Sequence, residues 1–262
     1  MIGRLISALL IGALLLVMPV GCASPTAAGS SAAARKAEND PLYALTLMRQ
    51  GSALLRQDRL TDALEKLEEA DRIAPGNGTL QNMIGLCHLR LEQFDRALAA
   101  FNAALDLIPE YSDARNNRGA TYLALRQFRL AEVDFIGVLA DSTYPHRYQV
   151  YYNLGMTYLE RGQIGAAEEN LRKAATAPAP VYDAFLRLAE IAEGRRDLET
   201  ALDLLEEAGL KFPDRIETTF ELGRIMLQLD RPEEARKLLD EVIAAAPGSD
   251  LAVQAASLIG HR

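Results

Sequence analysis

Apolar and small side chains recur along this chain with a period of 34 residues. Within each period the apolar positions follow the spacing i, i+3, i+4 and i+7 twice, as in the stretch that holds Tyr151, Leu154 and Tyr158. This spacing is typical of two amphipathic helices and not of strands. Two rows of small residues keep the same period: Gly51, Gly85, Gly119, Gly155, Ala189 and Gly223 in the first helix, and Ala63, Ala97, Ala131, Ala167, Ala201 and Ala235 in the second. We therefore predict six helical hairpins in succession.

A row of prolines marks the end of the second helix in most periods. Its members are Pro75, Pro109, Pro145, Pro213 and Pro247, and Ala179 takes the remaining place. Proline cannot continue a helical ladder, and the small residues let the two helices of a hairpin approach closely. A hairpin of this length, marked by Gly, Ala and Pro in this order, resembles the tetratricopeptide repeat. The resemblance implies an all-α fold, a right-handed superhelical solenoid of six such repeats with a C-terminal capping helix.

The repeating frame also sets the expected boundaries. The units are placed at 44–77, 78–111, 112–147, 148–181, 182–215 and 216–249, and the capping helix at 250–262. Such a helix covers the apolar face that a terminal repeat leaves open. The third unit is two residues longer than the others, in the connector that ends Tyr144-Pro145. This connector either presents an aromatic side chain at the edge of a binding groove or is a tolerated loop insertion.

The N-terminus has the features of an export signal. Residues 1–21 contain one basic residue, Arg4, and an apolar run that is short for a membrane span and suited to a signal peptide. Small residues lead from this run into Cys22, which resembles the lipobox of bacterial lipoproteins, although Pro19 stands where an aliphatic residue is usual. The resemblance implies that Cys22 is the acylated first residue after cleavage, and acyl chains anchor a protein stably when two or more are present. The alternative is an ordinary secretory signal that is cleaved elsewhere.

The segment after Cys22 is expected to be a linker. Residues 22–43 are rich in Ala, Ser, Gly, Thr and Pro, and this composition predicts a flexible tether. In the lipoprotein family an Asp directly after the cysteine tends to hold the protein at the inner membrane, and Ala23 stands there instead. The resemblance thus implies a lipid-anchored protein on the periplasmic face of the outer membrane of a diderm bacterium.

Composition and motifs exclude several classes of function. The formal net charge of −8 argues against nucleic acid, and against adhesion to anionic lipid through the repeat surface. The three histidines lie in different units without metal-ligand spacing, and neither a phosphate-binding loop nor a nucleophile elbow is present. Cys87 is interpreted as a small apolar filler. We therefore expect no metal, no cofactor and no catalytic residue, and a binding protein rather than an enzyme.

The tetratricopeptide resemblance implies that the first helix of each unit lines a concave groove. Apolar side chains there suit an amphipathic helix or an extended segment, and asparagine amides can bond to a peptide backbone. Some of these side chains could instead pack only against neighbouring helices. The candidate binding residues are Asn82, Leu86, Arg90, Asn116, Leu123, Tyr144, Tyr152 and Met156.

A six-repeat array behind a lipobox resembles the pilotin lipoproteins of type IV pilus machines, the PilF, PilW and Tgl type. Three local stretches are similar to that family: Arg115–Gly119, Ser142–Pro145 and Tyr152–Gly155. The resemblance implies a scaffold that helps the outer-membrane secretin to insert and form its ring, so the partner would be the secretin or another outer-membrane or periplasmic protein. Two alternatives remain: a lipoprotein adaptor for cell-wall hydrolases or a periplasmic protease, and a subunit of the barrel-assembly machinery.

Overall fold

The computed structural model describes residues 40–260, and these residues form thirteen α-helices joined by short turns and loops, without any strand. The predicted all-α fold is therefore confirmed. The helices are α2 (Pro41–Arg56), α3 (Leu60–Ile73), α4 (Gly78–Arg90), α5 (Phe94–Leu107), α6 (Ser112–Ala124), α7 (Phe128–Leu139), α8 (Arg147–Glu160), α9 (Ile164–Ala175), α10 (Tyr182–Gly194), α11 (Leu198–Lys211), α12 (Ile216–Gln228), α13 (Pro232–Ala245) and α14 (Asp250–Gly260).

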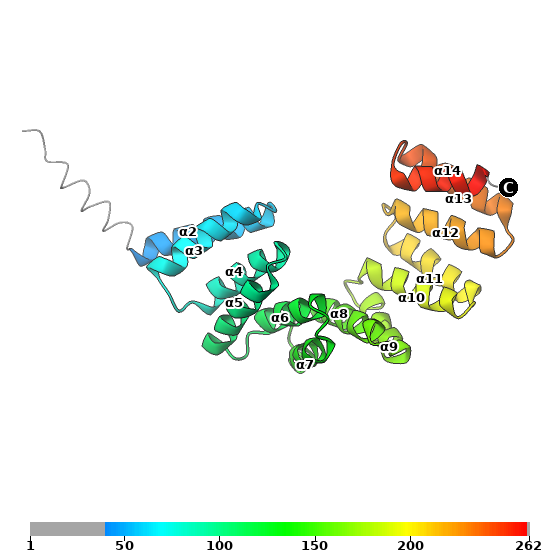
Figure 1. Ribbon diagram of the computed structural model, residues 1–262. Coiled ribbons are helices and arrows are strands. Elements are labelled where there is room, and N and C mark those ends of the chain that lie inside the picture. Colours follow the sequence, from blue (N-terminus) through cyan, green and yellow to red (C-terminus); the bar gives the residue numbers. More distant parts are fainter. Residues whose placement is uncertain (1–39, 261–262) are drawn as a thin grey trace, which may run out of the picture.

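Consecutive helices pair into hairpins that stack into a curved array (Figure 1). Each first helix packs most extensively against the second helix of its own hairpin, and each hairpin packs against the next one. In the middle of the array α4, α6 and α8 lie on the inner side of the curve, and α5, α7 and α9 lie on the outer side (Figure 1). The predicted solenoid of helical hairpins with a closing C-terminal helix is thus confirmed.

The N-terminal boundary differs from the expected one. The tether was expected to run to residue 43, whereas α2 begins at Pro41. The side chain of Asp40 accepts a hydrogen bond from the backbone N–H of Leu42 at 2.9 Å, and proline suits the first turn of a helix. This cap starts the helix earlier than the repeat frame indicates. The predicted signal peptide, Cys22 and the tether up to residue 39 lie outside the described residues, as do residues 261–262 of the predicted capping helix.

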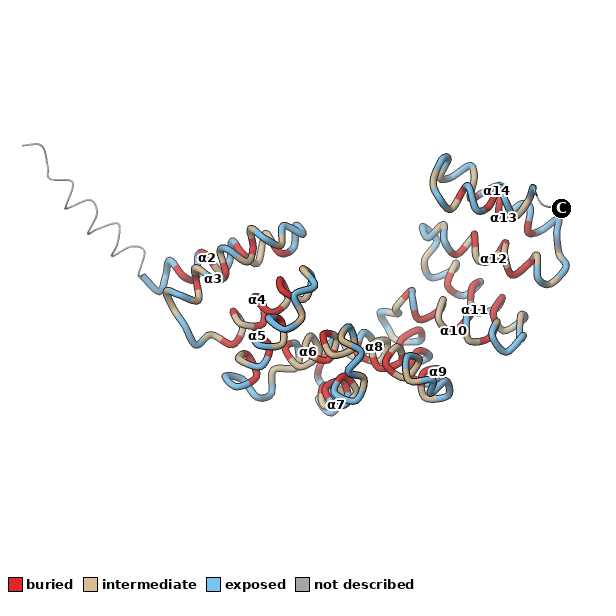
Figure 2. Tube along the Cα trace, in the orientation of Figure 1, coloured by how far each residue is buried: buried red, intermediate tan, exposed pale blue. Residues whose placement is uncertain are grey.

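The periodic small residues lie where the two helices of each hairpin touch. All six alanines of the second row are fully buried: Ala63, Ala97, Ala131, Ala167, Ala201 and Ala235. In the first row a Cβ atom on Gly51 would stand only 2.6 Å from Cγ of Leu67 in the facing helix. Buried positions accordingly recur along every hairpin (Figure 2). The close approach of the helices leaves no room for larger side chains at these places.

The reversal between the two helices of a hairpin uses a left-handed residue in all six units. Five of these residues are not glycine: Asp58, Glu92, Arg126, Arg196 and Asp230 have φ between 57° and 63°, and Gly162 takes the same place in the fourth unit. Such a conformation costs a non-glycine residue about 1–2 kcal/mol. The apolar surface buried between the two helices of the hairpin stabilises this left-handed conformation.

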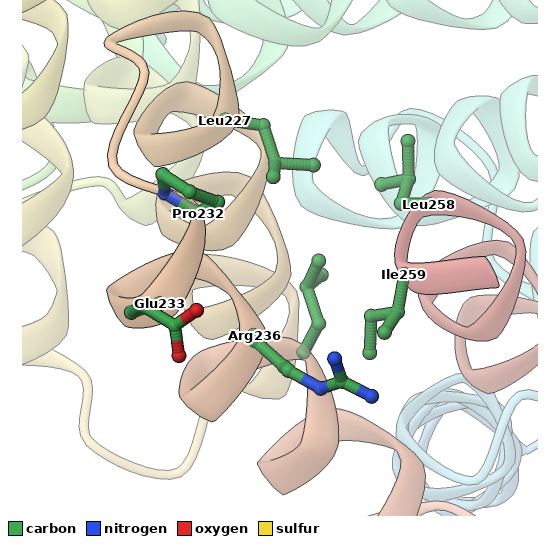
Figure 3. A pocket seen from close by; sticks show the side chains of 7 residues that line it. Leu227, Pro232, Glu233, Arg236, Leu258 and Ile259 are labelled. Carbon is green, nitrogen blue, oxygen red and sulfur yellow. The ribbon is translucent and has the colours of Figure 1, made fainter. Parts of the chain in front are cut away.

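The C-terminal helix α14 covers the last hairpin only in part. It packs against α13 and, more sparingly, against α12. Leu258 and Ile259 of α14 face Leu227 and Pro232 across a cavity of about 220 Å³, with Arg236 at its side (Figure 3). A single helix cannot fill the space that a full hairpin would occupy, so this cavity remains at the end of the array.

Candidate protein-binding groove

Seven of the eight predicted groove residues lie on α4, α6 and α8, which follow the inner side of the curve (Figure 1), and Tyr144 lies in the connector before α8. Leu86, Leu123 and Met156 are half-buried, so each side chain keeps part of its surface open to solvent. Leu86 and Leu123 also pack against the hydrophobic core of their own units. The inner side therefore offers a discontinuous row of aliphatic surface, to which an apolar partner could add further burial.

Asn82 is committed to contacts within the protein. It is buried, its Nδ2 donates to the Tyr111 hydroxyl at 3.4 Å, and its Oδ1 accepts from Asn117 Nδ2 at 3.0 Å. The bond from Asn117 joins the second unit to the third. The expectation that Asn82 hydrogen-bonds a partner's backbone is therefore not supported by the geometry, because both ends of its amide are in use.

Asn116 differs from Asn82 in having an unmet acceptor. Its Oδ1 is buried and has no hydrogen-bond partner among the described residues. A buried polar atom without a partner costs about 1–3 kcal/mol. A rotation of the Asn116 amide toward a donor on a bound segment would recover that cost, so Asn116 is the better candidate for fixing backbone register.

Arg90 connects the first two units. Its guanidinium donates to the Leu55 carbonyl at 3.1 Å and to Asp58 Oδ1 at 2.7 Å, and its side chain is 40% exposed. Asp58 is the left-handed residue in the turn of the first hairpin. Arg90 thus positions that turn and still presents part of its cation to the solvent.

Tyr144 does not project at the edge of the groove, and this expectation is wrong. Only 8% of the residue is exposed, and its ring packs in the core with Val150 and Leu154. The hydroxyl donates to Asp113 Oδ1 at 2.8 Å, and burial raises the pKa of Tyr144. The physical reason is the folded-back connector 140–146, whose two ends are tied together because Arg147 of α8 donates to the carbonyl of Leu139 of α7 at 2.8 Å.

Tyr152 lies at the junction of the fourth and fifth units. It is half-buried beside Arg187 of α10, and burial raises the pKa of its phenol. Arg187 donates from Nη1 to both carboxylate oxygens of Glu190, at 2.9 and 2.7 Å, while its Nε has no hydrogen-bond partner among the described residues. This junction therefore brings an aromatic ring and a guanidinium together between the fourth and fifth units.

Sequence reasoning missed an open depression next to this junction. Its volume is about 480 Å³, and it is lined by Leu159, Ile164, Arg187, Glu190, Ile191, Gly194 and Arg195. Gly194 ends α10 at the place where the other first helices carry a side chain, and no neighbouring heavy atom lies within 4 Å of where its Cβ would be. A glycine at the last helical position was the signal that could have located this depression.

The inner side of the last two units is occupied by an ion-pair network. Arg224 of α12 donates to both oxygens of Glu193 at 2.6 and 2.7 Å and to Glu221 at 2.7 Å, and Gln228 adds a bond to Glu193 at 2.6 Å. The Arg224 guanidinium holds the pKa of Glu193 down at about 2, and Gln228 contributes to the same effect. These side chains therefore satisfy one another across the junction of the last two units.

The part of the chain that the structure describes shows neither a metal-binding cluster nor a membrane-spanning helix. Residues 40–260 contain no group of three or more His, Cys, Asp or Glu side chains placed to hold a metal ion. Over the same range no helix is both long enough and apolar enough to cross a membrane. Cys87 is buried, and its burial raises the pKa of the thiol to about 11.

A curved stack of helical hairpins with small residues at each contact and a row of half-buried side chains on its inner side defines a helical repeat protein. Models of the tetratricopeptide repeat match residues 25–78, 82–142, 148–179 and 190–258. The chain belongs to the tetratricopeptide repeat family.

Two human proteins share sequence with this chain. It is 30% identical to the peptidyl-prolyl cis-trans isomerase FKBP4 over 108 residues, which are 41% of the chain and 21% of that protein. It is 23% identical to the protein O-mannosyl-transferase TMTC3 over 214 residues, 80% of the chain and 23% of that protein. The chain therefore spans only about a fifth to a quarter of the length of these relatives.

Two solved structures resemble the array along most of their length. PilW, described as a widely conserved type IV pilus biogenesis factor, superimposes with a TM-score of 0.72 and 22% identity, over 80% of this chain and 97% of PilW. PilF of Pseudomonas aeruginosa superimposes with a TM-score of 0.69 and 16% identity, over 82% of this chain and 97% of PilF. At these identities the likeness shows a shared fold.

Proposed function

We propose that the protein is a lipid-anchored interaction scaffold that promotes assembly of a type IV pilus secretin in the outer membrane. The observation that carries the proposal is the structural match to PilW, a type IV pilus biogenesis factor, over 80% of this chain and 97% of PilW. The chain would act without catalysis of its own, by holding a segment of the secretin monomer until monomers assemble. Its anchor would be acylated Cys22, which keeps the array at the periplasmic face of the outer membrane.

The binding surface would be the inner side of the first four units. Leu86, Leu123 and Met156 would pack against apolar side chains of the bound segment. Each side chain of the segment that becomes fully buried would contribute roughly 1.5–3 kcal/mol to binding. Asn116 would supply the backbone contact, and Tyr152 with Arg187 would anchor the segment at the junction of the fourth and fifth units. The alternative function, an adaptor for cell-wall hydrolases or a periplasmic protease, would use the same surface for a different partner.

The groove is tested with a double variant, Tyr152→Ala with Met156→Asp, in the organism's own deletion strain. We expect the deletion to leave secretin monomers and no pili, and the double variant to fold normally but to restore neither. Met156 is chosen because it is not part of a buried core cluster. Tyr152 packs against the cluster around Phe185, so circular dichroism of the purified double variant checks the fold before loss of function is assigned to binding. Leu210→Asp, at an aliphatic residue on α11 that is 85% exposed, is the matched control and should restore both. Heat-resistant secretin rings that persist in the deletion strain would contradict the pilus role and favour the cell-wall adaptor.

The anchor is tested separately with Cys22→Ala. The thiol is the acyl acceptor, so the variant should stay unprocessed and leave the outer-membrane fraction. Cell fractionation and intact mass measure both effects, and Cys87→Ala is the matched control because that thiol is buried within the array. Unchanged mass and fractionation of the Cys22 variant would refute lipidation.

A further inference from the structure

The outward face of α7 is apolar, unlike that of the other second helices. Leu130, Val133 and Ile136 are 48%, 67% and 50% exposed, and we call these three residues the outer patch. The residues equivalent to Val133 in the other units are Glu65, Ala99, Glu169, Asp203 and Lys237, and those equivalent to Ile136 are Glu68, Asn102, Arg172, Glu206 and Asp240. Single exposed apolar residues are ordinary, but three on one helical face form a patch that indicates an interaction.

The acidic side chains of α7 itself are held by neighbouring groups. Asp134 is bound by Arg118 at 2.7 and 2.8 Å, and Glu132 is bound by Arg161 and by the Tyr158 hydroxyl, so both acidic side chains of α7 are neutralised.

Two guanidinium groups lie at the ends of the patch without carboxylate partners. Arg129 forms no ion pair among the described residues, and it lies beside an open depression of about 390 Å³ that Phe128 and Leu130 also line. Within residues 40–260 Arg115 donates only to the Pro109 carbonyl, at 2.7 Å, and its Cδ lies 3.1 Å from the place of a Cβ on Gly137. The charges around the patch thus favour an acidic occupant, although the whole chain carries a net charge of −8.

A second copy of the chain fits this surface poorly. Antiparallel pairing of two α7 helices would bring Arg129 of one copy to Arg115 and Gly137 of the other, and parallel pairing would bring the two Arg129 side chains together. Both arrangements juxtapose like charges at an interface only one helix wide, whereas stable interfaces bury about 1,200 Å² or more.

A flat anionic membrane fits it poorly as well. The second helices α5 and α9 lie on either side of α7 along the outer edge of the array (Figure 1). Asp95 and Asp106 of α5 are exposed, so a membrane resting on the patch would also approach these carboxylates. A segment no wider than a helix would avoid them.

We propose that the outer patch binds an acidic amphipathic segment of a protein partner. The segment would lay apolar side chains on Leu130, Val133 and Ile136 and direct carboxylates toward Arg115 and Arg129. This surface lies on the opposite side of the array from the groove and does not depend on the function proposed above. The protein would therefore contact two segments at once, one on each side of its third unit.

The proposal is tested with the full chain and two synthetic helical peptides of about 18 residues, or five turns. Both carry leucine at i, i+3, i+4 and i+7, and the flanking positions are glutamate in one and lysine in the other. By fluorescence anisotropy we expect the glutamate peptide to bind at least about tenfold more tightly than the lysine peptide. Equal binding of the two peptides, or no binding of either, would overturn the proposal.

Variants locate the bound peptide. Val133→Glu with Ile136→Glu should weaken binding of the glutamate peptide by about tenfold or more, and Val133→Ser should weaken it less. Arg129→Glu should reduce the preference for the glutamate peptide. Leu210→Glu is the control, because this exposed aliphatic residue lies on α11, and it should bind as the unaltered chain does. Full binding by the double variant would place the peptide elsewhere and overturn the proposal.

Two further measurements exclude the other occupants. Sedimentation velocity should show the same association state for the full chain and for its Val133→Glu variant. The Cys22→Ala chain is mixed with phosphatidylglycerol vesicles and centrifuged. Any amount that sediments with the vesicles should be unchanged by Arg129→Glu. A patch-dependent dimer would assign the surface to a second copy, and Arg129-dependent vesicle binding would assign it to a membrane, so either result would overturn the proposal.

Discussion

Replacement of Gly85 by valine is expected to lower the free energy of unfolding by about 3 kcal/mol, at the upper end of the usual cost of overpacking. Gly85 lies in α4, and a Cβ atom there would stand 2.6 Å from Cε1 and 2.7 Å from Cδ1 of Phe101 in α5. Phe101 is fully buried and cannot rotate away. Valine adds two methyl groups beyond that Cβ, so the two helices of the second unit would have to separate. Denaturant unfolding monitored by circular dichroism measures the loss.

The control for this prediction is Gly165→Ala in α9. No neighbouring heavy atom lies within 4 Å of the place of its Cβ. Alanine stabilises a helix relative to glycine by roughly 0.5–1 kcal/mol, so this variant should equal or exceed the unaltered protein in stability. Because repeats unfold through contacts with their neighbours, the transition of the Gly85 variant is also expected to broaden. Equal midpoints for the Gly85 variant and the unaltered protein would contradict the close helix contact.

Replacement of Arg118 by alanine is expected to cost about 3 kcal/mol or more, because it leaves a buried carboxylate without its partner. Arg118 of α6 donates two bonds to Asp134 of α7, at 2.7 and 2.8 Å, and one to Asn102 of α5 at 2.8 Å. The side chain of Asp134 is only 5% exposed. The pKa of Arg118 is raised, mainly by its hydrogen bond to Asp134, which agrees with a strongly bound cation. Thermal and denaturant unfolding measure the loss.

Two comparisons show whether burial causes this effect. Arg118→Met with Asp134→Leu removes both charges and should recover most of the lost stability, since an apolar pair can replace a buried ion pair. Arg59→Ala breaks the Arg59–Asp62 pair, whose side chains are 59% and 48% exposed, and should cost less than about 1 kcal/mol. If the Arg118 and Arg59 variants lose equal stability, burial of Asp134 is not the cause.

The sequence alone determined the repeating frame and the contacts within each hairpin. Gly85 and Ala97 are only twelve residues apart in the chain, and their small side chains indicate that the two consecutive helices pack closely. Such short-range constraints recur in every unit, so the pattern is visible without the structure. That the first helices line the inner side was implied by the resemblance to the tetratricopeptide repeat, and the frame then supplied the residue numbers.

Only the tertiary structure decided which of these side chains remain available. Asn82 is bonded to Tyr111 and Asn117, and Tyr144 is bonded to Asp113, in each case across about one repeat length of sequence. The position of a residue in its own helix does not show which polar group about 30 residues away will bond to it. The exposure of Val133 has the same cause, because helical periodicity shows that α7 has an outer face but the stacking of units decides that nothing in residues 40–260 covers it.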